Sequence, residues 1–109
     1  MEERQAVSMF SALSQGTRLQ IVRYLVECGE TGAAAGEVGE KVGATSSRVS
    51  FHLAKLENTN IISSERQSRK IIYRANFSQL GGLVSFLLDD CCGGHPDIMS
   101  CCKSSDCNC

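Results

Sequence analysis

The segment Ala44-Thr-Ser-Ser-Arg-Val-Ser-Phe-His-Leu-Ala-Lys-Leu56 contains the pattern that decides the fold. Its apolar residues stand at helical spacing, i, i+4 and i+7: Val49, Leu53 and Leu56. The hydroxyl side chains ahead of them suit the N-terminal cap of a helix. Just upstream, Val38 and Val42 share one face of a shorter helix that Gly43 closes. Two short helices separated by a tight polar turn, the second bearing Arg48, predict a helix-turn-helix.

A basic hairpin is expected directly after this helix pair. The β-rich runs Ile61-Ile62 and Ile71-Ile72-Tyr73 bracket the polar residues 63–70, a pattern typical of two strands joined by a turn. Such a hairpin is the wing of a winged helix-turn-helix. The second helix of the pair then enters the major groove, and the wing contacts the DNA backbone.

Three more helices complete the expected fold. Periodic apolar residues predict one helix over residues 2–13 and another over residues 17–28, with Thr17 as the cap of the second. After the hairpin, Asn76-Phe-Ser-Gln79 resembles a capping box. The helix behind it has apolar residues at i, i+3, i+4, i+7 and i+8: Leu80, Leu83, Val84, Leu87 and Leu88. The predicted order is α-α-α-α-β-β-α, a mainly α winged helix-turn-helix.

Charge is unevenly distributed along a chain that is nearly neutral overall. The formal net charge of −1 argues against a uniformly basic nucleic-acid coat. Residues 44–74, however, hold six basic residues against two acidic ones, a net charge of +4. Because this block covers the second helix of the pair and the hairpin, a phosphate-binding surface is favoured over a solvated face.

Three stretches resemble the ArsR/SmtB family of metal-sensing bacterial repressors: Thr17-Arg-Leu-Gln-Ile-Val-Arg-Tyr-Leu25, Val49-Ser-Phe-His-Leu-Ala-Lys-Leu56 and Arg69-Lys-Ile-Ile-Tyr-Arg74. The resemblance covers residues 5–88. It implies a homodimer built on the first and last helices, which binds operator double-stranded DNA until a ligand releases it. By position it also implies a set of DNA-facing residues: Ser46, Ser47, Arg48, Ser50 and His52, with Arg66, Arg69 and Lys70 in the wing. For His52, a local hydrogen bond is the alternative role.

The cysteines gather at one end of the chain. Six of the seven lie in residues 91–109, and only Cys28, expected as a small core residue, precedes them. Disulfide frameworks spread cysteines through a fold, so this distribution favours metal binding or redox chemistry. No signal peptide and no apolar run of roughly 18 residues is found, so no membrane partner and a cytoplasmic location are expected. We expect a DNA-binding and dimerisation domain over residues 1–90 and an inducer-binding tail over residues 91–109.

The resemblance also limits where in the chain the inducer-binding site can lie. Some family members bind metal through cysteines at the start of the third helix, where residues 33–38 have none, and others use histidines of the last helix, where residues 77–90 have none. The tail remains. Thiolates select soft ions, and trivalent arsenic takes three of them. The expected ligands are Cys91 and Cys92, an adjacent pair like that of arsenic-responsive members, with Cys102 or Cys101 as the third.

Other inducers fit the same thiols. Antimonite would bind as arsenite does, and methylarsenite needs only two thiolates. Cadmium, lead, zinc and copper are alternatives, although adjacent cysteines disfavour a tetrahedral zinc site. A thiol redox switch and a thiol-rich metal buffer without a DNA role also stay open. No nucleophile–base pair, phosphate loop or paired carboxylates are found, so neither an enzyme nor an organic cofactor is expected.

Overall fold

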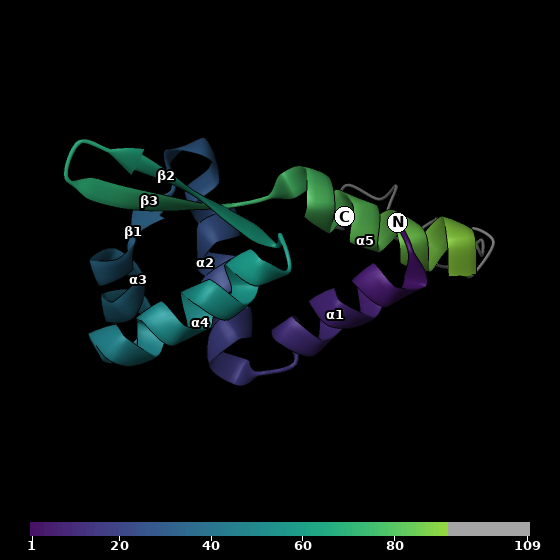
Figure 1. Ribbon diagram of the computed structural model, residues 1–109, viewed down its shortest axis with the longest axis horizontal. Coiled ribbons are helices and arrows are strands. Elements are labelled where there is room, and N and C mark those ends of the chain that lie inside the picture. Colours follow the sequence, from purple (N-terminus) through teal and green to yellow (C-terminus); the bar gives the residue numbers. More distant parts are fainter. Residues whose placement is uncertain (92–109) are drawn as a thin grey trace.

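The computed structural model describes residues 1–91, and the side chains of residues 1–88. Helices and short strands follow one another in this order: α1 (Glu3–Leu13), α2 (Gly16–Cys28), the 3-10 turn η1 (Gly29–Thr31), β1 (Ala33–Ala34), α3 (Ala35–Val42), α4 (Ser46–Asn58), β2 (Ile62–Gln67), β3 (Lys70–Ala75), α5 (Phe77–Ser85) and its π-helical continuation η2 (Phe86–Cys91). In Figure 1, α2, α3 and α4 lie beneath the hairpin, while α1 and α5 extend away from them on one side. The helix pair α3–α4 followed by a hairpin confirms the predicted winged helix-turn-helix.

A third strand joins the predicted hairpin. The antiparallel sheet has the order β1-β3-β2, with Ala33 opposite Tyr73 and Ser64 opposite the same Tyr73 on the other side. The sequence gives no sign of β1, because it is two alanines long and pairs through its backbone alone. Through β1, the sheet is attached to the start of α3, so the wing and the helix pair form one body.

The core lies where the helices α1 to α5 meet the sheet. It is built from the periodic apolar residues of each helix and the ends of both long strands, all of them buried: Ala6, Met9, Ala12, Ile21, Val22, Leu25, Ala33, Val38, Val49, Leu53, Leu56, Ile61, Ile62, Ala75 and Leu83. Cys28 packs half-buried against this core. Within the described residues, no helix is long and apolar enough to cross a membrane.

Helix caps agree with the sequence at one end of α4 and differ at α2. The Thr45 hydroxyl accepts a hydrogen bond from the Arg48 backbone N–H at 3.4 Å, as expected for the cap of α4. Thr17 does not cap α2, so that prediction is wrong. The helix starts at Gly16, and the Gln15 side chain accepts from the Arg18 backbone N–H at 2.9 Å. A longer amide side chain reaches the same orphan donor that a short cap residue would satisfy.

The capping box expected at the start of α5 is half formed. The Asn76 side chain accepts from the Gln79 backbone N–H at 3.4 Å. The Gln79 side chain does not return the bond, since its Oε1 accepts from Gln5 Nε2 of α1 at 2.9 Å. The Asn76 N–H donates instead to the Ile61 carbonyl at 2.8 Å. These two hydrogen bonds connect α5 to α1 and to the start of the hairpin.

Candidate nucleic-acid interface

One face of α4 is buried and the opposite face is open. Residues along a helix advance by about 100° each, which places Val49, Leu53 and Leu56 on one stripe, and all three are buried. The predicted DNA-facing residues at the start of the helix are exposed: Ser46, Ser47, Arg48 and Ser50. Hydroxyls and one guanidinium at the N-terminal end of an exposed helix suit contacts to phosphates and base edges.

The turn between α3 and α4 is tightly built. Gly43 has a positive φ of 67°, and the Ala44 N–H donates to the Gly39 carbonyl at 3.1 Å. A Cβ added to Gly39 would lie 3.2 Å from the Ala44 carbonyl and 3.3 Å from Val49 Cγ2. The lack of a side chain at this position therefore allows the close approach that sets the angle between the two helices.

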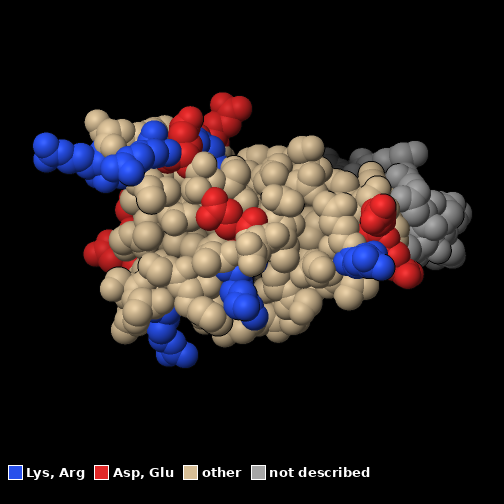
Figure 2. All heavy atoms as spheres, in the orientation of Figure 1, with Lys and Arg blue, Asp and Glu red and all other residues tan. Residues whose placement is uncertain are grey.

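The wing presents exposed basic side chains at its tip. Arg66, Arg69 and Lys70 are exposed around the turn of the hairpin, where Figure 2 shows blue side chains gathered at the upper left. The Arg74 side chain is used otherwise, because its Nη1 lies 3.1 Å from Glu65 Oε1 and its Nε donates to the Glu30 carbonyl at 2.6 Å. Arg74 thus holds the wing to the body, and the tip stays available for phosphate.

His52 differs from the other predicted contacts. Its side chain is only 7% exposed, and its Nδ1 has no hydrogen-bond partner within the described part of the chain. Burial lowers the pKa of His52 below its ordinary value, and the nearby Arg18 and Arg48 guanidiniums lower it further. In this structure the imidazole therefore faces the protein interior rather than a DNA groove. Its Nδ1 does not make the alternative local hydrogen bond with the described residues either.

Two further basic residues lie beside the predicted interface. Lys55 stands on the same edge of α4 as Arg48, seven residues later, and its Nζ lies 5.5 Å from the centroid of the Phe51 ring. Arg18, from α2, lines a groove on the protein surface together with Phe51 and Lys55. The spacing of Lys55 from Arg48 was visible in the sequence, but nothing there indicated that Arg18 meets α4.

Comparison with known proteins assigns this architecture to a family. The family model described as "Bacterial regulatory protein, arsR family" matches residues 15–64, from the cap of α2 into β2. The HTH-type transcriptional regulator YgaV of Escherichia coli (strain K12) is 30% identical over 88 residues, which span 81% of this chain and 87% of that protein. The chain belongs to the ArsR family. It is accordingly a DNA-binding transcriptional regulator.

Solved structures share the fold of this ArsR-family chain. An ArsR-like transcriptional regulator from Rhodococcus sp. RHA1 superposes with a TM-score of 0.73 at 23% identity, covering 89% of each chain. The winged helix-turn-helix DNA-binding domain of Mb0332 from Mycobacterium bovis, described as homodimeric, superposes with a TM-score of 0.63 at 22% identity, covering 88% of this chain and 94% of that one. Both agreements support the placement of α4 and the wing.

The buried His52 is expected to make the stability of this ArsR-family regulator depend on pH. Since its folded-state pKa is lowered, the unfolded chain binds a proton below about pH 6.5 that the folded chain takes up only at a lower pH. Stability should therefore fall as the pH drops below this value, with an added slope of at most about 1.4 kcal/mol per pH unit. Urea unfolding at several pH values should show a steeper loss in the wild type than in a His52→Gln variant. Equal slopes would contradict this assignment.

The predicted thiolate ligands fall at and beyond the edge of the structure. Cys91 is the last residue of η2, and its side chain is not described; Cys92, Cys101 and Cys102 lie outside the described residues. Within the part that is described, no three His, Cys, Asp or Glu side chains gather to hold a metal ion. The start of α3, where other family members carry cysteines, is made of Ala35 and Gly36.

Proposed function

We propose that this ArsR-family regulator is a repressor that releases its operator when trivalent arsenic binds cysteine thiolates of residues 91–109. The observation that carries the proposal is the position of six cysteines in the sequence after α5, beginning with Cys91, the last residue of η2. The described body offers no comparable cluster of ligands. This absence from the described residues supports residues 91–109 as the source of the ligands for an inducer.

The donor set suits a thiophilic ion. Cys91 and Cys92 supply two adjacent thiolates, and Cys101 or Cys102 supplies a third, which matches the three sulfur ligands of arsenite or antimonite. Methylarsenite needs only one of the pairs. Thiolates bind these ions after losing their protons, so binding strengthens as the pH rises toward the thiol pKa. Cadmium, lead, zinc or copper is the second candidate class, since a pair of Cys-Cys sequences also supplies four sulfurs.

A homodimer fits the exposed apolar residues of α1 and α5. Five large apolar side chains of α1, α5 and η2 are exposed: Val7, Phe10, Phe77, Val84 and Leu87. Exposed apolar residues that share adjacent helices favour burial against another chain, and a second copy buries them by symmetry. Mb0332, which has the same fold, is described as homodimeric. We therefore expect two copies of α4, one for each half of an operator.

A set of contacts joins α5, the helix that precedes the cysteines, to the DNA-facing helix. Gln5 of α1 donates to Gln79 of α5, and α1 in turn packs against α4. A change at the end of α5 on ligand binding would reach α4 through α1 and through the dimer interface. A coupling free energy of about 1–3 kcal/mol would weaken operator binding roughly 5- to 150-fold.

Arsenite should release the regulator from DNA through these thiols. The measurement is fluorescence anisotropy of a duplex of about 30 base pairs, enough for two half-sites, taken from upstream of the chain's own gene and titrated under reducing conditions. Arsenite should weaken binding of the wild type roughly 5- to 150-fold. Cys91→Ser, Cys92→Ser and the Cys101→Ser/Cys102→Ser double variant should lose this response. Cys28→Ser, which changes a thiol of the body, is the matched control and should respond like the wild type.

The other inducers give different outcomes in the same assay. Release by cadmium or zinc without release by arsenite would replace arsenic by another soft metal. Release by an oxidant that a reductant reverses would indicate a redox switch. A wild type that stays bound under arsenite, or thiol variants that release as readily as the wild type, would show the arsenic assignment to be wrong. An Arg69→Gln/Lys70→Gln variant tests the wing, since it should weaken DNA binding with or without arsenite.

A further inference from the structure

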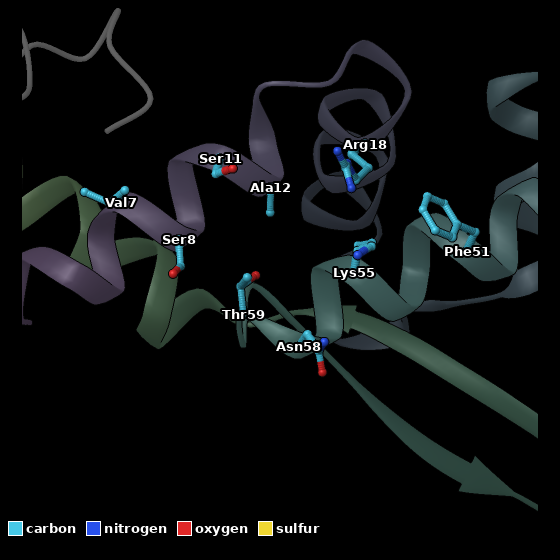
Figure 3. A pocket seen from close by; sticks show the side chains of 9 residues that line it. All are labelled: Val7, Ser8, Ser11, Ala12, Arg18, Phe51, Lys55, Asn58 and Thr59. Atoms are coloured by element: carbon cyan, nitrogen blue, oxygen red, sulfur yellow. The ribbon is translucent and has the colours of Figure 1, made fainter.

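A groove opens between α1, α2 and the second half of α4. Its volume is about 570 Å³, and Figure 3 shows side chains of all three helices around it. Ser8 and Ser11 line it from α1, while Arg18 comes from α2. Lys55 and Asn58 line it from α4. The groove is thus continuous with the exposed face of the helix that we place against DNA.

The charge of this groove is positive. Two cations line it, and none of its lining residues is acidic. The guanidinium of Arg18 and the neighbouring ammonium of Lys55 both favour an anionic oxygen in the groove, because hydrogen bonds between cationic donors and phosphate oxygens are strong.

The remaining lining residues suit a sugar–phosphate strand. The hydroxyls of Ser8 and Ser11 and the amide of Asn58 are donors of the kind that proteins direct at phosphate oxygens. Phe51, 56% exposed, adds an apolar wall that fits the carbon face of a deoxyribose. A free inorganic anion would use the cations but not this wall.

We propose that the groove binds a backbone phosphate of the operator, with Arg18 and Lys55 as its cationic ligands. This inference rests on the proposed seating of α4 against DNA. Arg48 and Lys55 stand on one edge of α4 and are separated by about 10 Å along the helix axis, so they contact different phosphates of one strand. The groove therefore adds a contact beyond the helix start and the wing, and it brings α1, a helix of the expected dimer interface, to the DNA backbone.

Removal of either cation should lower the salt dependence of DNA binding. Each phosphate contact contributes about 0.9 to the slope of log K against log salt. Because the two cations share one phosphate, Lys55→Gln and Arg18→Gln should each reduce the slope by at most about 1 per protomer bound and weaken binding by at most about fivefold per protomer at about 0.15 M salt. The probe is a mixed-sequence duplex of about 30 base pairs, because non-specific binding depends mainly on phosphate contacts.

Matched variants separate a phosphate contact from other effects. Arg23→Gln removes an exposed guanidinium of α2 that lines a different pocket, so it should leave the slope unchanged. Arg18→Lys keeps the charge and should keep most of the slope. Thermal unfolding of each variant tests whether the fold is intact, and Lys55 is exposed, so its replacement tests the groove even if Arg18→Gln fails to fold.

The outcomes distinguish this inference from the proposed function. If the wing variant Arg69→Gln/Lys70→Gln weakens binding while Lys55→Gln and Arg18→Gln leave the slope as in the wild type, the groove does not bind phosphate, and the DNA-facing role of the wing stands. If the wild type and every variant bind the duplex with the same affinity, the proposed interface itself is wrong. A slope lowered equally by Arg23→Gln would mean that overall charge, rather than the groove, is responsible.

Discussion

Replacing Leu53 by alanine is expected to destabilise the protein by about 2–5 kcal/mol. Leu53 is 1% exposed and lies on the buried stripe of α4, within the core that joins this helix to α1, α2 and the sheet. Truncation removes buried methyl groups and leaves a cavity that the surrounding helices fill only in part. Because a domain of this size is stable by only about 5–15 kcal/mol, the loss is a large fraction of the total. Urea unfolding followed by circular dichroism measures it.

A neighbouring residue provides the matched control. Phe51 stands two positions earlier on the same helix, is 56% exposed, and lines the groove rather than the core. Phe51→Ala should change the free energy of unfolding by less than about 1 kcal/mol, as surface substitutions usually do, although it removes more side-chain atoms. If the two variants lose similar stability, the orientation of α4 in this structure is wrong. The effect on DNA binding should be different. The folded Phe51→Ala protein should lose more affinity for DNA than its small loss of stability suggests.

The helices could be predicted because apolar periodicity reports a buried face directly. In α4 the stripe of Val49, Leu53 and Leu56 defines both the helix and the side that faces the core. His52 shares that stripe, three residues after Val49 and four before Leu56, so its burial was also visible from spacing. The resemblance to a DNA-binding family placed the His52 side chain at the groove of the DNA instead. Helical phase is the better guide to the exposure of a single side chain in this case.

Contacts between distant segments leave no comparable pattern in the sequence. Arg18 meets Lys55 at one groove only because α2 packs across α4, and no local pattern encodes that crossing. The Gln5–Gln79 bond likewise joins residues 74 positions apart. β1 escaped prediction for a related reason, since Ala33 and Ala34 have no strand propensity and join the sheet through backbone pairing to β3. The inducer site is the opposite case, because its prediction rests on sequence alone.

Replacing Gly32 by alanine is expected to cost about 2–4 kcal/mol of stability, because two separate penalties combine at this residue. Gly32 has a φ of +66° and a ψ of −167°, a conformation that side chains rarely adopt. An added Cβ would also lie 2.5 Å from the Tyr73 carbonyl oxygen and 2.7 Å from Ile72 Cγ2. Tyr73 and Ile72 are the residues of β3 that pair with β1, so the strand cannot move away without losing its ladder.

Gly43→Ala is the comparison for a positive φ without a clash. Gly43 also has a positive φ, +67°, but an added Cβ would meet nothing within 4 Å, so its replacement should cost only about 1–2 kcal/mol of backbone strain. The difference between the two variants in urea unfolding therefore contains the clash against β3 and the greater strain of a side chain at the ψ of −167° that Gly32 has, since Gly43 has a ψ of 39°. If Gly32→Ala is no more destabilising than Gly43→Ala, the close pairing of β1 with β3 is not maintained in solution. In that case the wing would be attached to the body through Arg74 and the ends of the hairpin alone, and the sheet would be the two-stranded hairpin that the sequence predicts.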